Sequence, residues 1–380
     1  MNNAMRDTLL NTLINHRRAL HQIPELGFDC FKTHAYLKKE LEMLGYETIT
    51  VARTGLIAIK QGSVDEGIAF RADMDGLPIV EENGNDYVSR HPGVMHACGH
   101  DGHMAMLLGF AQFMASLESV KKTVMFVFEP AEETYGGAPD IIRTQLFEQY
   151  HIKAIFALHL APDLEANTIG IKSGIMTAQD GDIDIEIVGK NAHGTTPKLG
   201  KDALLAGVDL IEQYHQLISH PELKMPSTLI NIGTFEAGEG RNIIAQSALI
   251  KGTIRALHLS DYEEIKQRLN EVNQHIENAH KVKVYAQVTD LHPPVFNDEN
   301  LYQLLLQNLE SFDYQVIEPM MIAEDFSYYQ KVMPGLFMML GIRKSDFNAT
   351  LHSARFDFDE SILITGVQLY QTIAKMMFVY

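Results

Sequence analysis

Two nearly continuous apolar runs of strand length, residues 123–128 and 153–158, constrain the fold of this chain more than any other feature. Nearly continuous apolar character over that length is typical of a strand that is buried on both faces of a sheet. Polar residues follow directly, because the first run leads into Glu129 and the second into His159. A helical pattern at 138–149 separates the two runs. Strands that alternate with helices and end in polar residues predict an α/β sheet with a site at its edge.

The order of predicted elements changes near residue 178. Between residues 182 and 288 the sequence predicts β-α-β-β-α-β, which is the split βαβ or ferredoxin-like unit. The later elements are too few to bury their own apolar surface, so we expect them to complete the first domain. The predicted architecture is an α/β catalytic domain, a mixed sheet flanked by helices, formed by residues 1–178 and 291–380. An α+β ferredoxin-like domain, residues 179–290, is inserted in it. A total of two domains agrees with the length of 380 residues.

The chain carries a formal net charge of −18, which argues against nucleic acid as a partner, because nucleic acid needs a basic surface. A small anionic substrate remains compatible, since a pocket can be locally positive on an acidic protein. Two cysteines, Cys30 and Cys98, permit at most one disulfide, so disulfides do not form the framework. Residues 1–20 carry polar residues within every apolar run, which predicts an amphipathic helix and neither a signal peptide nor a membrane span. We therefore expect a cytoplasmic enzyme without a membrane partner.

Residues 95–103, Met-His-Ala-Cys-Gly-His-Asp-Gly-His, hold three histidines and a cysteine and lead into an apolar helical pattern. Cys98 and His100 are two residues apart, so in an extended loop their side chains point to the same side. The start of the following helix carries a positive dipole end, which favours a thiolate at Cys98. Further candidates follow other strands: Glu132 and Glu133 after 123–128, His159 after 153–158, and His352 after a predicted strand at 336–340. Thiolate and imidazole together favour zinc, nickel, cobalt or manganese over magnesium or calcium.

Each of these residues also has an ordinary structural explanation. A lone histidine such as His159 is more often a hydrogen-bonded core residue than a ligand, and Cys98 alone would be a small buried apolar residue. The pair Glu132–Glu133 alone would usually lie in a solvated loop. The combination favours a site, because adjacent carboxylates directly after an apolar strand are costly unless they are compensated. Paired glutamates also suit metal-dependent hydrolysis, in which one carboxylate binds metal and its neighbour takes a proton from water.

Five motifs spread over the chain are Arg71-Ala-Asp-Met-Asp75, residues 95–103, Glu129-Pro-Ala-Glu-Glu133, His193 within Gly-Lys-Asn-Ala-His-Gly-Thr-Thr-Pro, and Leu351-His352. In these motifs, and in their order, the chain resembles the family of dinuclear-metal aminoacylases and amidohydrolases. That family includes hippurate hydrolases, indole-acetyl-amino-acid hydrolases and N-acetyldiaminopimelate deacetylases. Further stretches are most similar to the N-acetyldiaminopimelate deacetylases of bacilli: residues 17–28, 53–56, 157–162, 171–174 and 323–326.

The resemblance implies a centre of two divalent transition-metal ions held by five side chains: Cys98, His100, Glu133, His159 and His352. It also implies that Glu132 acts as general base and that Asp73 orients a ligating histidine from behind, which fixes its tautomer. The inserted domain would form a lid and mediate a homodimer. Its His193 would donate to the developing oxyanion, in the partner subunit's site. Asn242 and Arg255 would face the substrate carboxylate, which a guanidinium binds through two hydrogen bonds.

The resemblance further implies hydrolysis of the amide bond of a small-molecule N-acyl amino acid. The favoured substrate is N-acetyl-L,L-diaminopimelate, which gives L,L-diaminopimelate and acetate on the route to lysine. A broader N-acyl-amino-acid deacylase, acting on hippurate-like or acetylated sulfur amino acids, is the alternative. A catalytically silent metal-binding dimer is an alternative of another class, and Glu132 argues against it, because a binding module has no use for a second carboxylate beside Glu133. Arg255 has its own alternative, since an arginine at a strand end is at least as often a surface residue.

Overall fold

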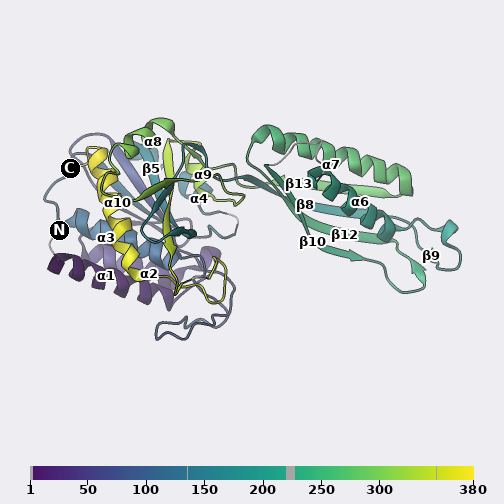
Figure 1. The fold of residues 1–380 in the computed structure, drawn as a ribbon, viewed down its shortest axis with the longest axis horizontal. Helices are drawn as coiled ribbons and strands as arrows, with labels where there is room; N and C mark the ends of the chain where they lie inside the picture. Colours follow the sequence, from purple (N-terminus) through teal and green to yellow (C-terminus); the bar gives the residue numbers. More distant parts are fainter. Residues whose placement is uncertain (1–2, 135, 220–226, 348) are drawn as a thin grey trace. The chain divides into compact units, whose positions relative to one another are not determined.

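The computed structural model describes residues 3–134, 136–219, 227–347 and 349–380. The protein divides into two compact units, drawn in Figure 1. The first unit comprises the residues up to Gly174, Phe296–Glu318 and Asp325–Tyr380, and the second comprises Ile175–Val295 and Pro319–Glu324. The second unit thus takes in a short segment, Pro319–Glu324, that we assigned to the first domain from the sequence.

A mixed sheet forms the centre of the first unit, and its described strands follow the order β1-β2-β4-β3-β5-β16-β6-β15. The strands are β1 (Glu47–Val51), β2 (Gly55–Lys60), β3 (Gly67–Asp73), β4 (Thr123–Glu129), β5 (Ile152–Glu165), β6 (Ile169–Ile171), β15 (Tyr314–Val316) and β16 (Gly335–Arg343). β3 runs parallel to β4 and β5, and β5 runs parallel to β16, whereas β2 is antiparallel to β1 and β4. Every residue of β3 and β4 is buried. The predicted mixed sheet is therefore confirmed.

Helices flank this sheet. They are α1 (Asn3–His21), α2 (Phe31–Met43), α3 (His100–Ser116), α4 (Ala138–Ile142), α5 (Leu146–Gln149), α8 (Glu299–Leu306), α9 (Phe326–Tyr329) and α10 (Leu363–Met376). α3 is buried along most of its length, because it packs against β3, α1 and α10. Gly109 permits this close packing, since a Cβ there would lie 2.4 Å from Leu13 of α1 and 3.1 Å from Val367 of α10. Within the described ranges no helix is both long and apolar enough to cross a membrane.

The second unit is built on an antiparallel sheet in the order β10-β12-β8-β13. Its main elements are β8 (Gln179–Val188), β9 (Ala192–His193), α6 (Ala203–Ser219), β10 (Thr228–Ala237), β11 (Ile243–Ile244), β12 (Ser247–Ala256), α7 (Leu259–His280) and β13 (Lys283–Asp290). Two short strands, β7 (Gly174–Ile175) and β14 (Phe296–Asn297), lie where the chain passes between the units. Alternate residues of β8 (Ile183, Ile185 and Ile187) are buried with residues of α6 and α7 in a core of their own. β10 lies at one edge of the sheet.

A buried network of charged side chains fastens α1 to the start of α3. The Arg17 guanidinium donates to Asp101 at 2.9 Å and to Asp357 at 2.6 Å. His21 lies one turn further along α1, and its Nδ1 donates to Asp101 at 2.8 Å while its Nε2 donates to Glu81 at 3.1 Å. Burial lowers the pKa of His21, but Asp101 and Glu81 outweigh burial and raise the pKa to about 9. His21 is therefore an imidazolium ion at neutral pH.

We expect His21 to make the stability of the first unit depend on pH. Its pKa rises from 6.5 in the unfolded chain to about 9 in the folded one. The stabilisation that His21 gives to the folded state is therefore complete below about pH 6.5 and is lost as the pH rises through about 9. The difference in free energy of unfolding between wild type and His21→Gln, from urea denaturation, should shrink by up to about 3 kcal/mol between about pH 6 and about pH 9.5. A difference between wild type and His21→Gln that did not change with pH would contradict the assignment.

Candidate metal centre

The candidate site lies at one edge of the first unit's sheet, where the parallel strands β3, β4 and β5 carry polar residues. The carboxyl ends of neighbouring parallel strands meet at the same edge of a sheet. β3 ends at Asp73 and β4 at Glu129, whereas β5 runs on past His159 to Glu165. The start of α3 joins this edge, because His103 in its first turn contacts Asp73 at 2.6 Å.

Gly99 makes the turn that separates Cys98 from the first residue of α3. Its φ of 88° is left-handed, and a Cβ there would lie 2.8 Å from Leu160 Cδ1. Cys98 is buried and faces β5, with Sγ 3.5 Å from Nε2 of His159. Burial, and then the nearby His103, lower the pKa of His159 to about 3. The His159 ring is therefore neutral, and its Nε2 offers a lone pair toward Cys98.

Glu132 and Glu133 follow β4 through a sharp turn at Ala131, whose φ is 67°. Asp75 holds this turn, because its carboxylate accepts from the backbone N–H groups of Glu132 and Glu133, each at 3.2 Å. The Asp75 carbonyl also accepts from Nδ1 of His100 at 2.9 Å. Nε2 of His100 then lies 3.9 Å from Oε2 of Glu132 and 3.8 Å from Oε1 of Glu133. One residue, Asp75, thus orients groups on both sides of the site.

His352 reaches the same place from the C-terminal part of the chain. Its φ is 61°, and its backbone N–H donates to the carbonyl of Ala97 at 2.8 Å. Its Nε2 lies 3.2 Å from Oε1 of Glu133. Cys98, Glu133 and His352 offer ligand atoms that all lie within 4.8 Å of one another, and the same holds for His100 with Glu132 and Glu133. The structure therefore gathers Cys98, His100 and His352 around Glu133, with Glu132 beside them, and His159 lies next to Cys98.

This arrangement fits a divalent metal ion. Nε2 of His100 is buried and has no hydrogen-bond partner within the part of the chain that the structure describes. A buried polar atom without a partner is costly, and a bound cation would satisfy it. Imidazole nitrogen, carboxylate oxygen and thiol sulfur are also the ligands that borderline-soft transition metals take in proteins.

Carboxylates dominate the electrostatics of the site. Burial lowers the pKa of His100, but neighbouring carboxylates, Asp73 first, raise it to about 10. Burial, and then Glu133 and Glu132, raise the pKa of the Cys98 thiol well above its usual range. Burial and these two carboxylates therefore oppose the thiolate that the start of the helix was expected to favour. A divalent cation would offset this negative charge and favour the ionised thiol.

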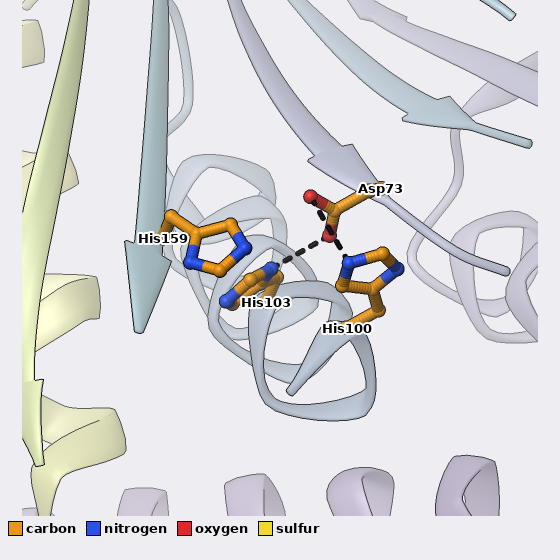
Figure 2. Close-up of side chains that lie close together, drawn as sticks. All are labelled: Asp73, His100, His103 and His159. Carbon is orange, nitrogen blue, oxygen red and sulfur yellow. Dashed lines mark hydrogen bonds and ion pairs between the residues drawn. The ribbon is translucent and has the colours of Figure 1, made fainter. Parts of the chain in front are cut away.

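Asp73 has a different main partner from the one we expected. We predicted that it orients a ligating histidine, but its Oδ1 accepts from Nδ1 of His103 at 2.6 Å, and His103 is outside the expected ligand set. The nearest approach of Asp73 to Nε2 of His100 is 3.7 Å (Figure 2). The other Asp73 oxygen accepts from Arg71 at 2.9 Å. The roles of Asp75 and Arg71 were not predicted from the sequence, although both residues lie in the Arg71-Ala-Asp-Met-Asp75 motif.

The three expected residues of the second unit lie at two separate places within it. His193 and Asn242 are neighbours, because β9 pairs with β11 and the Gly194 N–H donates to the Asn242 carbonyl at 2.8 Å. Arg255 lies near the other end of β12, paired with Asp180. At about 3.3 Å per residue, the strand from Ser247 to Arg255 spans roughly 26 Å. One copy of this unit therefore does not bring Asn242 and Arg255 to the same carboxylate.

The fold and the ligand cluster together define a metallohydrolase. The sequence profile of Peptidase family M20/M25/M40 matches residues 69–376. The chain is 37% identical over 366 residues to the N-acetyldiaminopimelate deacetylase of Bacillus licheniformis, which covers 95% of this chain and 97% of that enzyme. It is 35% identical, with the same coverage, to the Bacillus subtilis enzyme of the same name. A solved Bacillus subtilis structure, described as a dinuclear metal-binding peptidase of the M20 family, has a TM-score of 0.86 at 28% identity and covers 98% of this chain and 99% of that one.

The chain belongs to peptidase family M20/M25/M40. It is a metal-dependent amidohydrolase, as its motifs predicted. The dinuclear metal-binding relative and the cluster around Glu133 agree with a centre for two divalent metal ions.

Proposed function

We propose that this protein hydrolyses the amide bond of an N-acyl amino acid, and that its substrate is N-acetyl-L,L-diaminopimelate. The products would be L,L-diaminopimelate and acetate. The observation that carries the proposal is the position of Glu132, whose carboxylate lies beside the ligand cluster while Glu133 lies within it. The names of the relatives support this choice of substrate.

The proposed metal ligands are the five gathered side chains: Cys98, His100, Glu133, His159 and His352. Zinc, nickel, cobalt and manganese all suit this mixture of sulfur, nitrogen and oxygen. Bound cations would polarise the acyl carbonyl and make a water molecule more acidic.

The residues of the chain supply the proton transfers. Glu132 would take a proton from the attacking water and return it to the leaving amine, as a general base and then a general acid. The two backbone hydrogen bonds to Asp75 hold the Glu132–Glu133 turn in place for this task. His193 would donate a hydrogen bond to the oxyanion that forms at the acyl carbon.

We propose that the second unit is a lid and that it joins two copies of the chain. The spacing of Asn242 and Arg255 supports this, because His193 and Asn242 from one copy could then act beside Arg255 of the other. The edge strand β10 packs against α6, which exposes Leu205 and Val208. An open strand edge beside exposed apolar side chains is a suitable surface for a second copy. A chain that sediments as a monomer while it hydrolyses substrate at the same concentration would rule this arrangement out.

A panel of substrates tests the proposed activity. The protein would be reconstituted with each of the four metals and assayed on N-acetyl-L,L-diaminopimelate, hippurate and N-acetylcysteine. We expect the acetylated diaminopimelate to give the highest kcat/KM. Equal values across the panel would favour the broader deacylase. A protein that takes up metal and hydrolyses none of the three would favour the silent metal-binding dimer.

A further inference from the structure

The ring of His103 lies among the expected metal ligands, although the proposed mechanism gives it no role (Figure 2). Its centroid is 4.6 Å from that of His159 and 5.5 Å from that of His100, and the side chain is fully buried. Together with Asp73, these three histidines offer ligand atoms within 4.8 Å of one another. Position alone would therefore make His103 a further ligand.

The hydrogen bonds of His103 argue against that role. Its Nδ1 donates to Oδ1 of Asp73 at 2.6 Å, and its Nε2 accepts from the backbone N–H of Leu160 at 3.0 Å. A backbone amide can only donate, so Nε2 carries the lone pair and Nδ1 carries the proton. The protein itself occupies both ring nitrogens, and neither is left for a cation.

His103 is one member of a buried chain of hydrogen bonds. Arg71 of β3 donates to Oδ2 of Asp73 at 2.9 Å, Asp73 accepts from His103, and His103 accepts from Leu160 of β5. The first two bonds are charge-assisted and lie in a low-dielectric interior, which strengthens them. These hydrogen bonds therefore connect the first turn of α3 to β3 and to β5.

The peptide groups of Leu160 carry this restraint to His159. The Leu160 N–H is held by His103, while the Leu160 carbonyl accepts from Nδ1 of His159 at 2.8 Å. The second bond places the His159 proton on Nδ1 and leaves Nε2 for Cys98, 3.5 Å away. The His103 ring also packs near His100, whose centroid is 5.5 Å from that of His103 and 6.1 Å from that of His159. His103 thus lies beside both rings and restrains His159 through the two hydrogen bonds of Leu160.

We propose that His103 is a positioning residue that sets the separation and orientation of His100 and His159 without touching metal or substrate. The inference rests on the proposed function only in taking these two residues as ligands. Groups that orient metal ligands from behind commonly change metal affinity about 10–100-fold when they are replaced.

Two amide variants separate the two bonds of His103. In His103→Asn, the side-chain amide lies near the Nδ1 position and keeps a donor for Asp73, but it is too short to reach the Leu160 N–H. In His103→Gln, the amide reaches the Nε2 position and keeps an acceptor for Leu160. The matched control is Leu107→Ala, because Leu107 is fully buried in the same helix and is not among the ligand groups.

The measurement is a calorimetric zinc titration of each metal-free full-length variant, together with the absorption spectrum of its cobalt form. We expect His103→Asn to weaken one of the metal-binding steps by about 10–100-fold and to shift the cobalt spectrum. His103→Gln should be affected less, because it keeps the bond nearest His159. Leu107→Ala should lower the unfolding temperature and leave both metal readouts unchanged.

Two results would overturn the proposal. Wild-type affinity and an unchanged cobalt spectrum in His103→Asn would show that the ring only fills the core. A nitrogen–cadmium coupling to Nε2 of His103 in the cadmium-substituted protein would show that His103 is itself a ligand. These measurements use no acyl substrate, so they test the role of His103 even if the protein hydrolyses none of the substrates in the panel. Conversely, an unchanged zinc affinity in His103→Asn would not affect the result of the deacylation assay.

Discussion

The Glu132→Gln variant is expected to bind metal as the wild type does and to lose about 10²–10⁴-fold in kcat, the range attributed to a positioned general base. Glutamine keeps the size of the side chain and cannot take a proton from water. The backbone of residue 132 stays tied to Asp75, so the turn and the neighbouring Glu133 are preserved. Steady-state kinetics on N-acetyl-L,L-diaminopimelate and metal content by mass spectrometry check this result.

The control is Glu165→Gln, an exposed glutamate of β5 that pairs with Arg343. It should retain wild-type kcat and metal content. If Glu132→Gln lost metal together with activity, Glu132 would be a ligand. A metal-loaded Glu132→Gln protein with wild-type kcat would remove Glu132 from the mechanism.

Arg71→Met is expected to be the most destabilising single change considered for this chain. The Arg71 guanidinium is buried and contacts three carboxylates, at 2.6 Å from Glu129, 2.8 Å from Asp325 and 2.9 Å from Asp73. Removing one partner from a buried ion pair costs about 3–5 kcal/mol, because it leaves an uncompensated charge away from water. We expect the first thermal transition of the metal-free protein to fall by many degrees, or the variant to fail to accumulate in folded form.

The matched control is Arg343→Met, which breaks an exposed pair with Glu165 and should cost at most about 1 kcal/mol. A double variant, Arg71→Met with Asp325→Asn, should recover part of the loss, since it also removes one buried carboxylate. Equal stability of Arg71→Met and Arg343→Met would contradict this account.

The apolar runs predicted the central strands because burial on both faces leaves a direct pattern in the sequence. The run 123–128 is β4 (Thr123–Glu129), and the run 153–158 begins β5. The polar extension of β5 to Glu165 could not be predicted, because it depends on pairing with β16, far along the chain. The predicted helix 138–149 is interrupted, because Gln145 adopts a left-handed φ of 60°. Glutamine does not favour this conformation, so the interruption could not be predicted from the residue type.

The candidate ligands could be found because cysteine, histidine and glutamate at strand ends are conspicuous residue types. The partner of Asp73 could not, because His100 and His103 lie three residues apart on one face of α3, and the sequence does not tell which ring turns toward β3. The role of Asp75 was equally hidden, since its carboxylate binds backbone N–H groups that every non-proline residue carries. The distance between Asn242 and Arg255 could not be predicted either, because it depends on the length and register of β12.

β5 is synthesised long before β16, its partner strand in the sheet. β16 lies beside β5 in the middle of the first unit's sheet, yet its residues are synthesised after Ile175–Val295, which form most of the second unit. One edge of β5 therefore has no partner until most of the nascent chain has left the ribosome. Such an open apolar edge is prone to pair with other chains. The late arrival of β16 therefore leaves the sheet of the first unit open to such pairing while the chain is being synthesised.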